Sequence, residues 1–524
     1  MASAATDQLS GIASSEEELD CYSGLYSSRA KVLRPENLDQ LRRIFAHARE
    51  GGHRVTFRAG GHSFDGQALG DDLVVSLVRF DQIEVFANEQ RMRVGPGATW
   101  GAILAKLEPL GLAPAVTVTT EHATAGGTLS GDCLSRFSPA YGKEGNWIDG
   151  FDLLTTEGEL LTCGRPREGV PQSDWTREER VFQGVIGGLG YLGAVVAISY
   201  RVLSVGETRG LIGVLTKINK YKTFENLAAD LVPQAEQTYL EESDPQDPEK
   251  LDAISSALDT RANGAQAALL FRSAFTREPR RRLMALYRPR LAVRILVELL
   301  MRVRFLSGPL WRFCFRFLYR NDEKYIDDLD GFTFFMDGNA RVRGAAKRFG
   351  IKLDMIQQTF VVPSDPKAEG GWDRARDDLV EWLDYTHDFL LERGLTPTIH
   401  DVLFIPKDSP FPFLLSASAD LPGFAVSYAF ETSEKAELER IKEAFSEMAE
   451  VLRERFGGRV YLVKNVCAEQ KTLAAMYGDH AVAFFNLKRE LDPHGILRNA
   501  FLERNFGDLF EAGSTATRAT IPRS

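Results

Sequence analysis

The sequence predicts an α+β protein with more than one domain. Its 524 residues are enough for two or three domains, each with a well-buried core. Apolar residues make up 44% and charged residues 26%, which is ordinary for a globular chain. From residue 29 to about 205, short strands and helices alternate, with glycine at nearly every turn. From 206 to 480 the pattern changes: helices are expected to dominate over 223–330, and strands and helices then alternate.

The first of these two regions gives the clearest pattern of elements. Residues 36–50 place apolar side chains at helical spacing, and residues 100–110 predict a second helix that Gly111 ends. Glu157-Gly158 predicts the turn of a hairpin. The expected strands cover residues 31–34, 54–58, 73–77, 91–94, 147–154, 160–163 and 194–203, and the glycine-rich stretch 126–145 is expected to be mostly loop.

Composition and charge exclude several classes of protein. The net charge of −10 and the pI of about 5.5 leave no global basic field for nucleic acid. The five cysteines lie far apart and form no CxxC pair, so neither a disulfide framework nor a metal site is expected. The N-terminus lacks the basic and apolar parts of a signal peptide, and no uncharged apolar run is long enough to span a bilayer. These features predict a cytoplasmic protein.

Residues 277–320 form a strongly basic segment. They hold twelve arginines, no lysine and only two acids, with apolar and aromatic residues between them. We expect an amphipathic insert that makes peripheral contact with an anionic membrane surface or a lipid phosphate. The alternative is a pair of helices whose arginine stems cover the protein's own apolar surface. No acidic stretch nearby balances the charge, which favours membrane contact.

Glycine-rich turns give the first indication of a ligand. Gly60 and Gly61 directly follow a predicted strand, so main-chain N–H groups there can approach a diphosphate closely. His62 stands at the mouth of this turn, where a ring nitrogen can attack an electrophile. Residues 119–131 add hydroxyl groups and further N–H donors, of the kind that a diphosphate and a ribityl chain need.

Two more glycine-rich turns follow at residues 141–145 and 187–193. The second contains Gly188-x-Gly190-x-x-Gly193, the spacing of a dinucleotide fingerprint. That fingerprint opens a helix, whereas residues 194–203 have the pattern of a strand. A Rossmann-type NAD site is therefore not expected.

In their order and spacing, these four segments resemble the FAD-binding domain of the vanillyl-alcohol oxidase and p-cresol methylhydroxylase flavoproteins. Residues 61–68 are similar to the motif in cytokinin dehydrogenases and sugar-lactone oxidases whose histidine bonds the flavin 8α-methyl group. Residues 152–160 and 488–497 are similar to the later hairpin and to the closing K-x-x-x-D-P segment. The likeness covers roughly residues 28–205 and 459–505, and it implies FAD as the cofactor.

The resemblance also implies which residues hold FAD. His62 would bond the flavin covalently, and Thr120 stands where berberine-bridge-type members carry a second bonding cysteine, so a single bond is expected. The other residues expected at the cofactor are Arg58, Ala59, Gly60, Gly61, Ser63, Phe64, Gln67, Ala68, Thr119, Thr120, Thr124, Gly126, Gly127, Ser130, Gly131, Gly142, Gly190, Gly193 and Val195.

The implied organisation is a two-subdomain FAD-binding domain of the p-cresol methylhydroxylase type joined to an α+β substrate, or cap, domain. The boundaries are an N-terminal extension over 1–27, the FAD-binding domain over 28–205 and the cap domain over 206–480. The cap domain includes the helical, arginine-rich insert at 277–320. Residues 481–524 are expected to return to the FAD-binding domain.

The second half resembles decaprenylphosphoryl-ribose 2-oxidases, in residues 356–363, 423–428 and 457–465. This likeness implies three catalytic residues: Lys464 near the flavin pyrimidine ring, Tyr461 beside it and Gln357 in the pocket. The arginine-rich insert is similar to that of sterol Δ24-reductases, which act on a membrane lipid. The pocket asparagine and cysteine of the ribose oxidases fall at Ala425 and Ser427, so their phosphoribose site is not carried over.

The expected activity is hydride transfer from a C–H or CH–OH group of a lipid-linked or apolar substrate to flavin N5. A fixed positive charge at Lys464 would stabilise the anionic reduced flavin, and Tyr461 could relay a hydroxyl proton. Two alternatives stay open: a reductase of a lipid C=C bond that uses NAD(P)H, and a membrane-docked flavin protein without turnover. Cys133 is a candidate for control of oxygen access. The partners expected are a small or lipid-like substrate and no nucleic acid, and the oligomeric state stays open.

Overall fold

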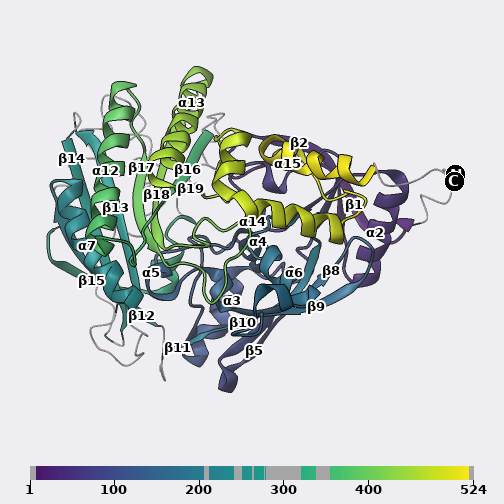
Figure 1. The fold of residues 1–524 in the computed structure, drawn as a ribbon. Helices are drawn as coiled ribbons and strands as arrows, with labels where there is room; N and C mark the ends of the chain where they lie inside the picture. The colour runs from purple at the N-terminus through teal and green to yellow at the C-terminus, as the bar shows by residue number, and fades with distance from the viewer. Residues whose placement is uncertain are drawn as a thin grey trace.

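The computed structural model describes residues 8–205, 212–240, 251–262, 265–276, 278, 320–337, 354–432 and 434–518. Helices and sheets are mixed throughout this part of the chain, as the predicted α+β class requires. The N-terminal strands and helices gather at one end of the molecule, and the later sheets with their covering helices form the other end (Figure 1). The C-terminal helices lie over the N-terminal end.

The first sheet has the strand order β1-β2-β4-β3. It consists of β1 (Ala13–Asp20), β2 (Ser27–Arg34), β3 (Val55–Arg58) and β4 (Leu73–Ser76), and β4 runs parallel to both of its neighbours. Residues 13–20 were expected within an extension that precedes the first domain. Instead they pair along the whole of β2, because their backbone completes the edge of this sheet.

Helix α2 (Leu38–Gly51) packs on the first sheet, as predicted. The side chain of Asn37 caps its N-terminus by accepting a hydrogen bond from the Gln40 amide at 3.0 Å. Gly52 ends it in the left-handed conformation at φ 69°. The buried face of the helix carries Leu41, Ile44 and Phe45, the residues whose spacing predicted it.

The second sheet has five antiparallel strands in the order β5-β6-β10-β8-β9. These are β5 (Ile83–Phe86), β6 (Arg91–Val94), β8 (Ile148–Leu154), β9 (Leu160–Gly164) and β10 (Ala194–Arg201), and α3 (Trp100–Leu107) and α6 (Arg177–Val185) pack with them. Strand β10 begins directly after Gly193, which confirms that the glycine motif does not open a Rossmann helix. A Cβ on Gly193 would come within 2.8 Å of the Leu154 carbonyl oxygen, so this strand crossing needs glycine.

One prediction for the first region was wrong. Residues 126–145 were expected to be mostly loop, but they include α4 (Ala125–Gly131) and α5 (Ser138–Tyr141). Glycine has a low intrinsic helix propensity, which hid α4 from sequence reasoning. Glycine is nevertheless required at position 126, because a Cβ there would come within 2.5 Å of the Pro96 side chain.

The cap region contains two four-stranded sheets, β13-β14-β12-β15 and β17-β18-β16-β19. The first is built from β12 (Gly213–Tyr221), β13 (Ala253–Ala262), β14 (Ala265–Thr276) and β15 (Glu323–Asp328). The second is built from β16 (Asp354–Pro363), β17 (Ile399–Ile405), β18 (Gly423–Thr432) and β19 (Arg459–Val460). The Ser256 hydroxyl joins the sheets by exchanging hydrogen bonds with the backbone of Val402 at 2.8 and 2.9 Å.

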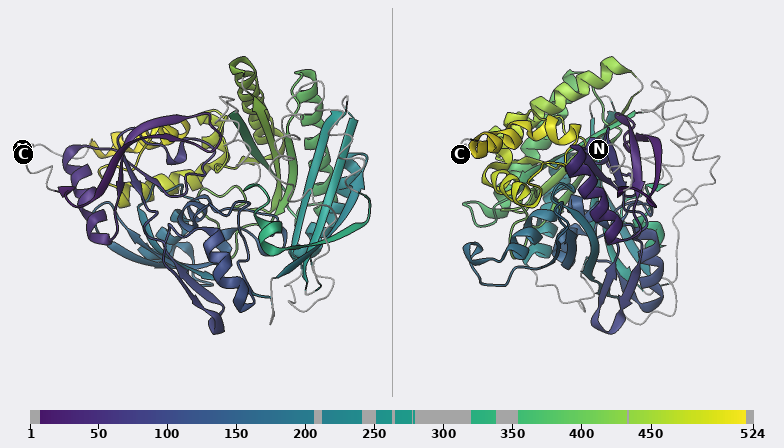
Figure 2. Two further views of the ribbon diagram at one scale, coloured as in Figure 1. Left: turned by 180° about the vertical axis from the view of Figure 1, so that it is seen from behind. Right: turned by 90° about the vertical axis from the view of Figure 1, so that its right-hand side faces the viewer.

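Helices α7 (Phe224–Leu240), α12 (Gly371–Glu392) and α13 (Lys435–Val451) cover these sheets (Figures 1 and 2). The expectation that helices dominate 223–330 was wrong for the described residues, where β13, β14 and β15 are strands. The sequences of β13 and β14 are rich in alanine and serine and have little intrinsic β preference, so cross-strand pairing in their long hairpin decides their structure.

The C-terminal helices α14 (Gln470–Leu491) and α15 (Ala500–Arg518) return to the first sheet, and the expected boundary at 480 falls inside α14. Lys488 is buried there and donates to the carbonyls of Tyr191 and Leu497 at 3.1 and 2.7 Å. It also pairs with Asp492 at 2.8 Å. The K-x-x-x-D-P segment therefore fastens the end of the chain to the 187–193 turn.

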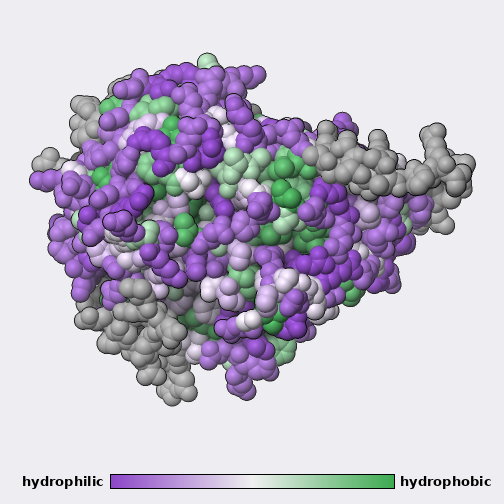
Figure 3. Space-filling model, viewed as in Figure 1, coloured by the Kyte–Doolittle hydropathy of each residue, from purple (hydrophilic) through white to green (hydrophobic). Residues whose placement is uncertain are grey.

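No helix in the described part of the chain is long and apolar enough to cross a membrane. On the face seen in Figure 3, apolar residues form small patches between hydrophilic ones. Nearly all of the basic segment 277–320 lies outside the described residues, so its helical structure and its membrane contact stay predictions.

Candidate functional site

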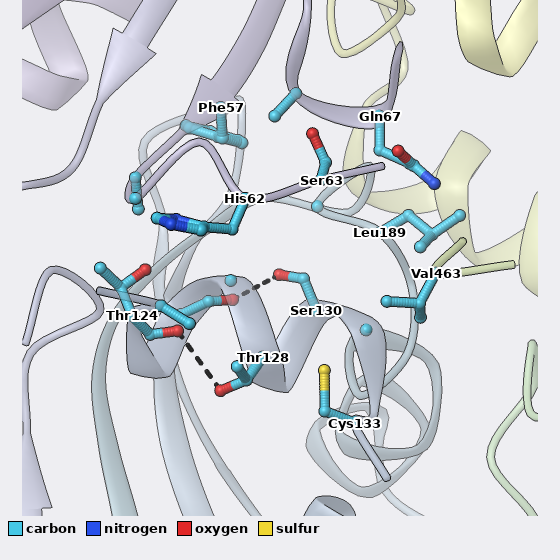
Figure 4. Close-up of a pocket in the computed structure, with 18 of the residues that line it drawn as sticks. Phe57, His62, Ser63, Gln67, Thr124, Thr128, Ser130, Cys133, Leu189 and Val463 are labelled. Carbon is cyan, nitrogen blue, oxygen red and sulfur yellow. Dashed lines mark hydrogen bonds between the residues drawn. The ribbon is translucent and has the colours of Figure 1, made fainter. Parts of the chain in front are cut away.

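A large cavity lies between the two N-terminal sheets and the segment that follows β19. Counted out to its mouth, including space open to solvent, its volume is about 1370 Å³. Figure 4 shows His62 on one side of this space and Val463, the neighbour of Lys464, on the other, with α4 beneath them. The wall comes from β3 and the loop after it, the 118–124 segment, α4, the 185–195 turn and residues 463–464.

The loop after β3 exposes backbone donors to this cavity. Gly61 has φ 69°, and a Cβ there would come within 2.4 Å of the Arg58 guanidinium. Arg58 itself donates to the Asp20 carbonyl at 3.0 Å, so it holds the turn in place. Among the described residues, the N–H groups of Gly61 and of the next three residues have no acceptor within the protein. Such a row of unused donors suits a bound diphosphate.

His62 is held as a neutral imidazole. Burial lowers its pKa, and the nearby His122 lowers it further. Its ring lies 5.6 Å from the Tyr22 ring and 6.3 Å from the His122 ring, and its Nδ1 atom is buried without a regular hydrogen bond. A neutral ring nitrogen with an unused lone pair can act as a nucleophile.

Helix α4 supplies the floor of the cavity (Figure 4). Its Thr128 and Ser130 hydroxyls bond back to carbonyls one turn earlier, Ser130 to Gly126 at 2.8 Å. The hydroxyls of Thr124 and Ser63 are buried and unpartnered within the described residues. Buried polar atoms without partners are costly, so they indicate where a polar ligand belongs. Together with the loop donors, they fit the diphosphate and the hydroxylated chain of FAD.

Lys464 reaches the cavity from the opposite side. The amide of Gln67 donates to the carbonyls of Leu462 and Lys464 at 2.9 and 3.1 Å, which ties this segment to the His62 loop. The Lys464 ammonium lies 3.9 Å above the Phe64 ring. Burial lowers the pKa of Lys464 to about 8, against the opposing influence of Cys133 and Asp401. The side chain is therefore a cation near neutral pH and can release its proton slightly above it.

Two parts of the chain match known families. Residues 30–164 match a model described as an FAD binding domain, and residues 426–505 match one described as D-arabinono-1,4-lactone oxidase. The chain is 28% identical over 167 residues to cytokinin dehydrogenase 2 of Arabidopsis thaliana, which is 31% of each chain.

Two further relatives show similar coverage. The chain is 31% identical over 145 residues to cytokinin dehydrogenase 1 of Arabidopsis thaliana, with 27% of this chain and 24% of the relative covered. It is 28% identical over 133 residues to the FAD-linked oxidoreductase ptmO of Penicillium ochrochloron, with 25% and 29% covered. The chain thus covers about a quarter to a third of the length of these curated relatives.

The chain contains an FAD-binding domain, and its matched segments are similar to FAD-linked oxidoreductases. FAD is its cofactor, and the comparisons support the expected relation to FAD-binding oxidoreductases without naming a closer relative. The closer likeness of the second half to ribose oxidases and sterol reductases stays a prediction.

In this FAD-binding protein, the residues expected at the cofactor line one cavity, with the exception of Gly142. Gly142 has φ 77° and packs against Asn146 instead. Its conformation requires glycine, but it shapes the turn before η4 (Glu144–Trp147) rather than the wall. Sequence reasoning did not single out several apolar wall residues, because only the fold brings them together: Phe57, Leu77, Pro96, Val118, Val185, Leu189, Leu192 and Val463.

Of the three expected catalytic residues, only Lys464 is part of the wall. The Tyr461 hydroxyl donates to the carbonyls of Gly131 and Asp132 at 3.3 and 3.2 Å, and burial raises its pKa well above the ordinary value. It therefore braces α4 rather than facing the space. Gln357 lies on β16, where its main chain exchanges hydrogen bonds with Asn465 at 2.8 and 2.9 Å.

The protein also has an ionisable residue near Lys464 that the sequence did not reveal. Asp401 on β17 interacts electrostatically with Lys464, and its pKa is raised to about 7, chiefly by burial. A perturbed carboxyl beside a perturbed lysine is typical of functional sites. A single aspartate inside a strand carries no motif, so no signal in the sequence pointed to it.

Proposed function

We propose that this protein oxidises a CH–OH group of its substrate, with FAD held through a bond from His62. The observation that carries the proposal is that His62 and Lys464 line one cavity, in which His62 lies across from Val463, the neighbour of Lys464 (Figure 4). One end offers a neutral imidazole and the other a cation of near-neutral pKa. Between them lie unused N–H donors and hydroxyls that suit the rest of the cofactor.

FAD, when bound, supplies the hydride acceptor of the reaction. The chain's own residues then bind and orient the cofactor and the substrate, and they exclude water from the site. The 61–64 loop and the Thr124 and Ser63 hydroxyls would hold the polar parts of the cofactor. Lys464 would place positive charge where negative charge develops during the reaction, and its interaction with that charge is stronger in a buried site than in water.

The names of the relatives favour oxidation over reduction. Both the lactone oxidase model and the cytokinin dehydrogenases carry names of oxidising enzymes. Reduction of a C=C bond with NAD(P)H is the second candidate, and it is tested by mixing the protein anaerobically with NADPH. Bleaching by NADPH and none by any alcohol would replace oxidation with reduction. The lipid-linked part of the substrate rests on residues 277–320 and stays a prediction.

The bond to His62 is tested by acid precipitation. We expect the flavin of the wild-type protein to stay in the pellet and to fluoresce on a denaturing gel. His62→Ala should release it to the supernatant, because no other histidine and no cysteine of the described wall lies in that loop. His122→Ala, which removes the neighbouring ring, is the matched control and should keep the bond. Flavin that stays with the His62→Ala pellet would contradict the proposal, as would wild-type flavin in the supernatant.

A further inference from the structure

The ring of Phe64 lies under the ammonium group of Lys464. The Nζ atom is 3.9 Å from the ring centroid, well inside the roughly 6 Å reach of a cation–π contact. Both residues belong to the cavity wall. Within the described part of the chain, this ammonium donates no hydrogen bond and has no carboxylate at ion-pair distance. Among the described residues, the ring is therefore the group in contact with the ammonium that stabilises its charge.

Phe64 is held in place from two sides. The Nδ2 atom of Asn465 donates to the Phe64 carbonyl at 3.1 Å. The Phe64 ring centroid lies 5.0 Å from that of Tyr22, with the ring planes tilted by 55°. The Tyr22 amide also donates to the carbonyl of Ser63 at 2.8 Å, so the N-terminal segment braces the same loop. The ring is thus part of a fixed frame.

The backbone of Lys464 belongs to the same frame. Gln67, from the His62 loop, donates to the Lys464 carbonyl at 3.1 Å. Asn465 is 1% exposed, and its backbone and side chain exchange hydrogen bonds with the backbone of Gln357 on β16 at 2.8 and 2.9 Å. The ring and the lysine backbone are therefore fixed, whereas the stem of the lysine side chain is flexible. A contact at the end of that stem decides where the charge lies.

An aromatic ring suits this task better than a carboxylate. A carboxylate would cancel the charge, whereas a ring stabilises the cation through its negative face and leaves the charge intact. The other ionisable groups that act on Lys464 are Cys133 and Asp401. Burial raises the pKa of the Cys133 thiol, so it stays neutral. The pKa of Asp401 is about 7, and no ion pair joins its side chain to the ammonium.

We propose that Phe64 is a positioning residue, whose ring holds the Lys464 ammonium at the cavity wall and keeps its charge directed to the flavin. This inference rests on the proposed function, because it concerns how the charge of Lys464 is held there. It gives Phe64, which was expected among the cofactor residues, a role that acts through the lysine. Loss of the ring should therefore weaken the charge rather than the binding of FAD.

The midpoint potential of the bound flavin, measured against pH with a reference dye, tests the inference without substrate or turnover. Where Lys464 has lost its proton, the negative charge gained on reduction draws one back, so the potential falls more steeply with pH. In wild type this change of slope is expected near pH 8. Phe64→Leu should move it about one pH unit lower, an about tenfold change in the protonation equilibrium that a desolvated cation–π contact can supply. Phe64→Tyr keeps an aromatic face and should behave as wild type does.

A double-mutant cycle separates an effect on the lysine from an effect on the flavin. Lys464→Met has no ammonium and should show no change of slope, and Phe64→Leu added to it should have no further effect. The control is Phe389→Leu on α12, which removes a ring that lies 3.6 Å from the guanidinium carbon of Arg393. It should keep the wild-type profile. If Phe64→Leu does not load FAD, Phe64→Met takes its place with the same expectation.

The possible results separate this inference from the proposed function. If Lys464→Met changes the profile but Phe64→Leu does not, the inference fails and the charge role of Lys464 stands. An equal effect of Phe64→Leu with and without Lys464 would also overturn the inference, because the ring would then act on the flavin itself. If Lys464→Met has the wild-type profile, the charge role fails and the inference fails with it. The bond to His62 is examined separately by acid precipitation.

Discussion

Two buried lysines, Lys143 and Lys464, show how surroundings separate a structural charge from a functional one. Lys143 is 2% exposed and lies 2.8 Å from Asp408, with Asp132 and the Ser416 hydroxyl also in contact. Burial favours its neutral form, but the two carboxylates outweigh burial and raise its pKa. Every side of this ammonium is occupied, and the cluster joins α4 and η4 to the loop after β17.

Lys464 has no carboxylate at ion-pair distance among the described residues. It faces an aromatic ring and an open cavity, and burial lowers its pKa to about 8. The comparison teaches that burial alone does not define a catalytic lysine. A buried charge whose partners are complete stabilises the fold, whereas one with an open side is available to a ligand.

The largest effect expected from this comparison is on stability. Lys143→Met should lower the free energy of unfolding by about 3–5 kcal/mol, because it leaves two buried carboxylates without their cation. Chemical denaturation of the flavin-loaded protein measures this loss. Lys471→Met removes an exposed lysine from its pair with Glu469 and should change stability little. Equal losses in the two variants would mean that the Lys143 cluster has no special role.

A smaller effect, on catalysis, is expected at the second lysine. Lys464→Met should lower kcat about 10²- to 10³-fold, the usual cost of removing one charge-stabilising group from a site. Its flavin content and resistance to denaturant should stay at or above those of wild type, because no ion pair is broken. Lys464→Arg, which keeps the charge, should recover part of the rate. A Lys464→Met protein that turns over normally would remove this lysine from the mechanism.

The smallest effect is a shift with pH. The Lys464 ammonium is lost above a pH of about 8, so wild-type activity should fall there, and Lys464→Arg should stay active to higher pH. The effect of this lysine on stability runs the other way. Its pKa in the folded protein lies below the ordinary 10.5, so below about pH 8 the buried charge lowers the free energy of unfolding. This loss of stability becomes smaller as the pH rises from about 8 to 10.5. Lys464→Met should therefore melt at a higher temperature than wild type at pH 7 and at the same temperature near pH 10.5. A wild-type rate that is flat to pH 10 would contradict this assignment.

The sequence by itself determined the class of the fold, the cofactor and most of the cavity wall around His62. Those features depend on local backbone chemistry: Gly61 and Gly193 are needed where a turn is tight or two chains approach closely, and such needs are visible in a short motif. The helix α2 was equally visible, because a cap and an apolar face act within a few residues of one another.

Only the tertiary structure decided the rest. The pairing of β13 with β14 overrode weak local preference, and close packing against Pro96 requires glycine within α4. Tyr461 was expected at the substrate, but its hydroxyl is engaged by carbonyls more than three hundred residues earlier in the chain. Asp401 interacts electrostatically with Lys464 and Arg136, which are remote from it in sequence, and Lys143 pairs with Asp408 from a distant loop. The physical reason is the same in each case: the energy of these groups depends on partners remote in sequence, which no local pattern encodes.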